Sequence, residues 1–175
     1  VFNYENPKEV LATGGGAISI TGTGGGSVQG IFLQNTDILS TSGDITMNGG
    51  VNGIRVASSG VRIGSRSSSA ITSSSSNIIW TANSLDLITL SSGFSNNFST
   101  SGKVTIEPSS NSFSNAITYP ITNLSISNTI TGLTLGKSTN TANITIANAQ
   151  TIAGPISVYG GDIAINNNLT STANN

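Results

Sequence analysis

Aliphatic residues alternate with small polar residues along most of the chain. One short cassette recurs: a small or turn residue, a variable residue, an aliphatic, a small polar residue and an aliphatic. Examples are Gly16–Ile20, Gly43–Met47, Gly102–Ile106 and Gly161–Ile165. Alternation with a period of two predicts strands that bury one side, because successive side chains of a strand point to opposite faces.

The spacing of these cassettes predicts a repetitive architecture. Aliphatic pairs beginning at Leu85, Val104, Leu124, Ile144 and Ile163 follow one another at intervals of about 20 residues, and further pairs lie between them. A solenoid explains such an interval, since each coil must return to stack on the previous one. We therefore expect an all-β chain that forms a right-handed parallel β-helix of about 20 residues per coil, the handedness following from the crossover rule.

In this interpretation Thr105, Ser125 and Thr145 form an outward ladder of hydroxyls on successive coils, which needs no ligand. The Ser- and Asn-rich stretches 58–77, 91–102 and 107–115 are expected to be turns and loops that project from the rod. Residues 1–175 are expected to form a single β-solenoid segment. A start at Val1 rather than Met predicts that it belongs to a larger repetitive protein.

Composition narrows the possible functions. Charged residues make up 7% of the chain, the net charge is −1, and Gly, Ser, Thr and Asn supply roughly half of the residues. So weak a charge does not attract nucleic acid, and no stretch is long enough for a transmembrane helix. Without cysteine or histidine, the usual zinc, iron–sulfur and haem sites are excluded, and we expect no metal or other cofactor.

Candidate binding residues are few. Arg55, Arg62 and Arg66 lie within twelve positions and are candidates for gripping an anionic glycan through bidentate contacts, although a solvated surface is the simpler interpretation. Phe94 and Phe98 lie in a Ser/Asn-rich stretch, where they would be available to stack on sugar rings. Trp80 follows Ile78 at strand spacing and is expected in the core.

Asp44 and Asp162 follow glycine at corresponding cassette positions. Turn capping by the carboxylate explains them better than calcium binding, because calcium requires several clustered oxygen ligands. The glycine runs Gly14–Gly16 and Gly24–Gly26 are expected in tight turns, since no Gly-Lys-Ser/Thr sequence opens a helix after either of them. The acidic residues are scattered and no histidine is present to activate a serine, so no catalytic residues are assigned.

The segments "GDITMNGG", "GVRIGS" and "ANITIANAQTIAGPISVYGGDIAINNNLTSTA" resemble the repeat regions of filamentous-haemagglutinin-like bacterial surface adhesins. The resemblance implies a secreted, fibrous stalk at the bacterial cell surface, adhesion to cell, surface or matrix glycans, and a role in biofilm. It carries over no catalytic residues. Two alternatives remain open: a carbohydrate-active β-helix enzyme of the polysaccharide lyase kind, and a subunit that stacks end to end into extracellular filaments.

Overall fold

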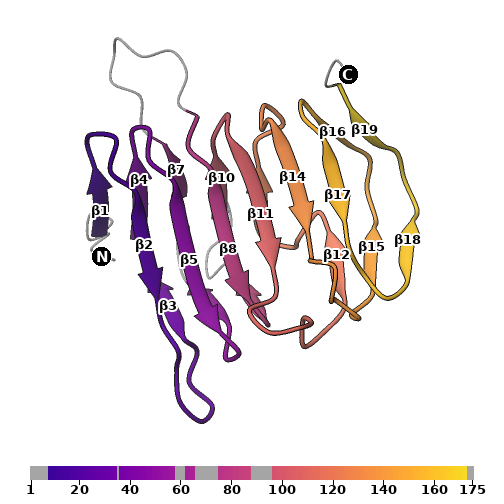
Figure 1. Ribbon diagram of the computed structural model, residues 1–175, viewed down its shortest axis with the longest axis horizontal. Coiled ribbons are helices and arrows are strands. Elements are labelled where there is room, and N and C mark those ends of the chain that lie inside the picture. Colours follow the sequence, from indigo (N-terminus) through magenta and orange to yellow (C-terminus); the bar gives the residue numbers. More distant parts are fainter. Residues whose placement is uncertain (1–7, 35, 58–61, 66–74, 88–95, 173–175) are drawn as a thin grey trace, which may run out of the picture.

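The computed structural model describes residues 8–34, 36–57, 62–65, 75–87 and 96–172. All regular structure in these residues is β, and every ladder is parallel. The strands stack as a β-solenoid of about five turns with a spacing of roughly 27 residues between stacked strands. Figure 1 shows the coils following one another from β1 at one end of the molecule to β18 and β19 at the other.

Each coil contributes three strands, which divide the surface into three faces. The first face contains β1 (Lys8–Ala12), β4 (Thr36–Ser40), β7 (Arg62–Ser65), β10 (Asn96–Ser99) and β13 (Leu124–Ile126). In the last coils β16 (Gln150–Ile152) and β19 (Leu169–Ser171) take this place in chain order and form a separate two-stranded ladder.

The second face is one continuous ladder. Its strands are β2 (Ile18–Thr21), β5 (Ile45–Gly50), β8 (Ile78–Ala82), β11 (Lys103–Glu107), β14 (Gly132–Leu135) and β17 (Ile156–Val158). The third face consists of two separate ladders. One contains β3 (Ile31–Gln34), β6 (Ile54–Ala57) and β9 (Leu85–Leu87), and the other contains β12 (Ile117–Tyr119), β15 (Ile144–Ile146) and β18 (Ile163–Ile165).

The alternation seen in the sequence is the alternation between core and surface. In β5 the buried positions Ile45 and Met47 are both fully shielded, and they stack in register on Ile78 and Trp80 of β8. The next coil continues the stack with Val104 opposite Ile78. Such stacking of aliphatic side chains contributes about 25 cal/mol for each Å² of apolar surface removed from water.

The expected interval of about 20 residues per coil was wrong. Leu85 lies on the third face in β9, Val104 on the second in β11, Leu124 on the first in β13 and Ile144 on the third in β15. Each of these three steps of about 20 residues therefore moves two strands along the chain, whereas a complete coil requires three. Of the expected stack, only Ile144 and Ile163 are direct neighbours in a ladder.

The expected hydroxyl ladder fails for the same reason. Thr105, Ser125 and Thr145 lie on the second, first and third faces. The cassette has the same form on every face, so the spacing of cassettes does not reveal which strands are stacked. The right-handed winding stays a prediction.

The corner between the first and second faces is built from glycine and hydroxyl side chains. Gly43 donates its N–H to Ser40 Oγ at 3.0 Å, and Gly102 donates to Thr100 Oγ1 at 2.8 Å. A Cβ atom on Gly43 would lie 2.1 Å from the carbonyl oxygen of Gly16 in the previous coil, so only glycine permits this close stacking. In the first coil Gly24 and Gly26 have φ near +60°, which confirms the turn predicted there.

Candidate functional site

The third face is interrupted between the third and fourth coils. No ladder in the described part of the chain joins β9 to β12, and most Cα–Cα distances between these two strands exceed 8 Å. Neighbouring strands of a ladder lie about 4.8 Å apart. The interruption forms an open groove of about 370 Å³, lined by β9, by Ala116–Thr118, and by Ile121 and Thr122.

The floor of the groove consists of core-facing side chains that are partly exposed. Leu85 and Leu87 of β9 and Ile117 of β12 are only half-buried. The residues that stack on them from the far side of each strand are almost completely shielded, with Ile54 1% exposed and Ile144 0% exposed. The missing neighbour strand therefore leaves apolar surface uncovered on both walls.

One rim of the groove carries opposite charges. Phe32, Arg55 and Asp86 are successive outward residues of the third face, in register across β3, β6 and β9. Arg55 Nε lies 3.4 Å from Asp86 Oδ2, and both side chains are more than one-third exposed. The Arg55 guanidinium also lies 5.9 Å from the centre of the Phe32 ring, whose residue is 53% exposed. A cation–π contact of this kind holds the guanidinium toward the aromatic ring.

Hydrogen bonds close the two ends of the groove. At one end Ser114 donates its backbone N–H to the carbonyl oxygen of Asn83 at 2.8 Å. At the other end Asn123 Nδ2 donates to the carbonyl oxygen of Leu87, also at 2.8 Å. Coils three and four are therefore joined at both corners of the third face and separated between them.

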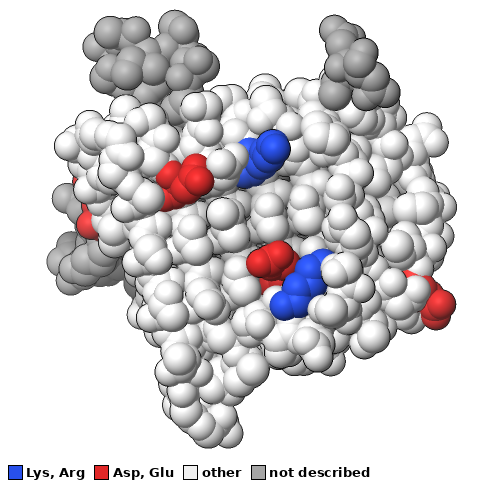
Figure 2. Space-filling view, in the orientation of Figure 1, with Lys and Arg blue, Asp and Glu red and all other residues white. Residues whose placement is uncertain are grey.

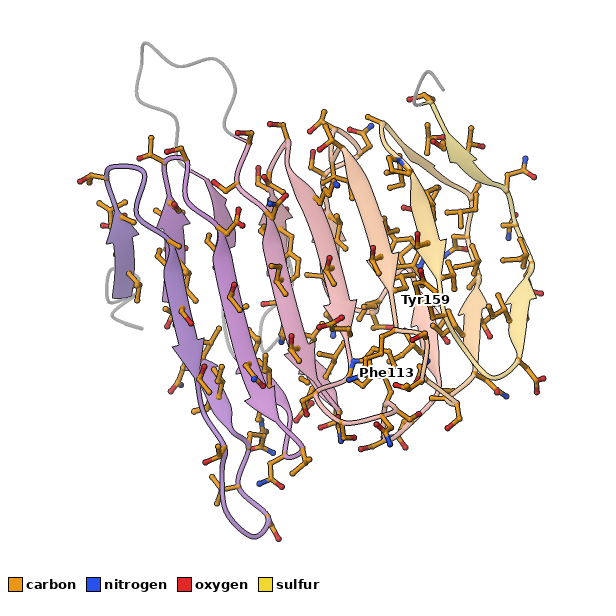
Figure 3. All side chains as sticks on the ribbon, viewed as in Figure 1. Phe113 and Tyr159 are labelled. Atoms are coloured by element: carbon orange, nitrogen blue, oxygen red, sulfur yellow. The ribbon has the colours of Figure 1, made fainter. Side chains whose placement is uncertain are left out.

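A second feature is the corner between the second and third faces, where buried asparagines join successive coils. Asn140 Oδ1 accepts from the backbone N–H of Phe113 at 3.1 Å and from Ser112 Oγ at 2.9 Å. Asn140 Nδ2 donates to the carbonyl oxygen of Tyr159 at 2.8 Å. Figure 3 shows Phe113 in the connection between β11 and β12 and Tyr159 at the end of β17. Asn140 thus holds three coils together.

The predicted arginine cluster is divided between faces. Arg55 lies on the third face in β6, whereas Arg62 lies on the first face in β7, in register with Asp37 and Asn97. Arg66 lies outside the described residues. Of the three, Arg55 is the residue that the structure places beside a groove.

The predicted aromatic pair has a different outcome for each member. Phe98 is fully buried in β10, with its ring 4.8 Å from that of Trp80, so its expected position in a projecting loop was wrong. Its neighbours in sequence are polar, but the period-two alternation of β10 points Phe98 inward. The prediction that Trp80 belongs to the core is confirmed. Phe94 lies outside the described residues.

The two aspartates of the cassettes also differ. Asp44 Oδ1 accepts from the backbone N–H of Asn77 at 2.9 Å and from Asn77 Nδ2 at 3.0 Å, which confirms turn capping there. At Asp162 it is the backbone N–H that forms a bond between coils, donating to Asn143 Oδ1 at 3.0 Å. Within the described residues no three acidic side chains gather as a cation site would require.

The groove itself was not predicted. Its sequence signal is the stretch from Pro108 to Asn115, which interrupts the alternation between β11 and β12 and was interpreted as a projecting loop. The structure instead buries Phe113 of this stretch in the core. Ser110 accepts from Asn83 Nδ2 at 2.7 Å, so the connection packs against the preceding coil.

Charged side chains are sparse on one face of the molecule. Figure 2 shows a face on which the Lys, Arg, Asp and Glu side chains are few and scattered among uncharged residues. In the groove lining, Asp86 is the one carboxylate among the described residues. The described residues contain no helix of the length and apolarity needed to cross a lipid bilayer. No family model, curated protein or solved structure matches this chain.

Proposed function

We propose that this chain is a structural and adhesive segment of a secreted bacterial surface fibre. The observation that carries the proposal is the open final coil of the solenoid. Ile163 and Ile165 of β18 are 43% and 56% exposed, although the residues below them in β15 are fully buried. A further coil of compatible register, from the same polypeptide or from a neighbouring molecule, would bury them.

The coil geometry supports the mechanical part of the proposal. The second face is an unbroken parallel ladder of six strands, so backbone hydrogen bonds run along the length of the rod. The side chains on its outer surface include Thr46, Thr105 and Thr134, which are small and polar. A rod with this surface extends without attracting oppositely charged partners along its sides.

The polysaccharide lyase alternative draws on the groove of the third face. Lyases and glycosidases of this architecture need clustered carboxylates or a carboxylate with a positioned base. Asp86 and Arg55 are the residues that this alternative would use. Asp86 is the one carboxylate among the described residues of the groove lining, and no second acid joins it there, which favours the stalk proposal.

Adhesion is tested by coupling the purified chain to fluorescent beads and measuring bead retention under flow on surfaces coated with heparan sulfate, mucin or albumin. The proposal expects retention on at least one glycan coating that exceeds retention on albumin. Electron microscopy of the same preparation is expected to show rods. Retention equal to that of beads carrying an unrelated protein of net charge −1, on every coating, would contradict the adhesive role.

Cleavage is measured in parallel. The lyase alternative expects new reducing ends, or absorbance from an unsaturated product, when the chain is incubated with uronic-acid polysaccharides. Loss of that signal in Asp86→Asn would assign it to the groove. Turnover of this kind would replace the stalk proposal with the enzymatic one.

A further inference from the structure

Between β9 and β12, backbone pairing across the third face is interrupted and core side chains are left partly uncovered. We infer that the groove between these strands binds a short extended peptide segment as an additional parallel strand. The segment carries aliphatic side chains at two alternate positions and a basic residue between them. This assignment does not depend on the adhesive role proposed above.

The backbone of β9 presents hydrogen-bonding groups to the groove. In a parallel ladder, alternate residues direct their N–H and C=O groups to opposite sides. Ile54 of β6 donates its N–H to the carbonyl oxygen of Ser84, so Ser84 and Asp86 face β6. The peptide groups of Leu85 and Leu87 therefore point away from β6. The carbonyl oxygen of Leu87 already accepts from Asn123 Nδ2, so the N–H and C=O of Leu85 and the N–H of Leu87 are the groups that β9 directs into the groove.

The backbone of β12 also directs hydrogen-bonding groups into the groove, from its opposite wall. Ile117 donates its N–H to the carbonyl oxygen of Asn143, so Ile117 faces β15. The peptide groups of Thr118 consequently face the groove. An inserted strand would pair its own backbone groups with both edges.

The two walls of the groove are too far apart to pair with each other directly. Two ladder steps of about 4.8 Å separate strands that have a third strand between them. Most Cα–Cα distances between β9 and β12 exceed 8 Å, well beyond a single step. Three-residue strands on both sides fix the length of the paired segment at about three residues.

The floor and rim of the groove indicate which side chains the bound segment would carry. Leu85, Leu87 and Ile117 leave apolar surface uncovered, which two inward aliphatic side chains of a bound segment would cover. Between these two, the outward residue of the segment would lie between Asp86 and Thr118 in the outer row of the third face. The half-exposed Asp86 carboxylate favours a Lys or Arg there.

The test uses the full chain and a capped peptide, Ser-Thr-Ile-Arg-Val-Thr-Ser. Saturable binding is expected, measured by calorimetry and by NMR. The backbone amides of Leu85, Leu87 and Thr118 should exchange with solvent about ten-fold more slowly in the bound state. A version of the peptide with N-methyl groups at alternate amides keeps the side chains, blocks strand pairing, and should not bind.

Reversing the charge of Asp86 provides the second part of the binding test. Asp86→Lys should weaken binding of the Arg peptide about five-fold and strengthen binding of a matched peptide with Glu at the centre. Asp162→Lys makes the same charge change at an exposed position before β18 and should leave both affinities unchanged. Equal thermal unfolding of the two variants would show that each is folded.

Three results would overturn the inference. One is the absence of saturable binding at millimolar peptide. Another is equal binding of the N-methylated peptide, which would indicate nonspecific apolar contact. The third is binding of uronic-acid oligosaccharides that competes with the peptide and perturbs Asp86 and Thr118 without slowing amide exchange. That result would identify the groove as a glycan site.

Discussion

The second and third faces contain the same kind of alternating aliphatic strand, contributed by the same coils, yet only the second is continuous. The difference arises at the connection from Pro108 to Ala116, between β11 and β12. This connection inserts Phe113 into the core and pairs Ser110 with Asn83. It leaves β11 stacked on β8 but holds β12 away from β9. The comparison teaches that a corner connection can open one face of a solenoid while the neighbouring face stays closed.

The largest expected effect compares one leucine from each face. Leu133→Ala on the second face removes a side chain that is 1% exposed, and should lower the free energy of unfolding by about 3 kcal/mol. Leu85→Ala on the third face removes a half-buried side chain beside the groove and should cost about 1 kcal/mol. Urea denaturation of both variants measures the difference. Equal losses would indicate that the groove is closed in solution.

The next effect concerns Tyr119, which is 2% exposed on the inner side of β12. Burial raises the pKa of Tyr119 to about 12. In the unfolded chain a tyrosine loses its proton near pH 10, while the folded chain retains it up to about pH 12. The folded state therefore binds more protons in this window, and stability should fall as the pH rises from 10 to 12, by at most about 3 kcal/mol.

Two matched variants isolate the contribution of the Tyr119 phenol to this pH dependence. Tyr119→Phe should remove most of the decline in stability between pH 10 and pH 12, because the phenol is gone. Tyr159→Phe, at a residue that is 42% exposed, should leave the decline in place. Denaturation midpoints at several alkaline pH values distinguish them. A decline unchanged in Tyr119→Phe would show that water reaches the inner side of β12 beside the groove.

A smaller effect compares the two aspartates. Asp44→Ala removes two hydrogen bonds to Asn77 at the start of a second-face strand, and should cost about 1.5 kcal/mol. Asp162→Ala, at the start of the third-face strand β18, should change stability by less than about 0.5 kcal/mol. Thermal unfolding checks both. A larger loss for Asp162 would reverse the assignment of the capping residue.

The smallest effect is the ion pair of the third face. Both side chains are exposed, so a double-mutant cycle with Arg55→Gln and Asp86→Asn should give a coupling of about 0.5 kcal/mol or less. The coupling should decrease further at high salt. A coupling well above 1 kcal/mol would mean that the pair is shielded from water, contrary to an open groove.

Much of the fold could be predicted from the sequence. Alternation of Ile144, Ile146, Ile163 and Ile165 with small polar residues predicted short strands, and β15 and β18 are such strands. Parallel stacking in coils followed from the regular recurrence of cassettes. The number of strands per coil could not be predicted, since a strand that buries one side has the same pattern on every face. The burial of Phe98 was missed because its neighbours resemble a loop in composition.

Only part of the candidate site could be predicted from the sequence. Arg55 was identified as a candidate binding residue, and it lies beside the groove. Asp86 was one of the acidic residues described only as scattered, and Thr118 had no distinguishing feature. Whether two strands are adjacent depends on the path of the connection between coils, and neither strand contains a signal for it.

By itself, the sequence determined that the chain forms short strands with aliphatic interiors, glycine turns and a nearly uncharged surface. These properties depend on local alternation and composition, which act within a few residues. Only the tertiary structure decided which strands are neighbours, where the third face opens, and that Ile163 and Ile165 remain exposed at the end of the rod. Such outcomes depend on contacts between residues about one coil apart, where the space occupied by one connection sets the distance between the strands that follow it.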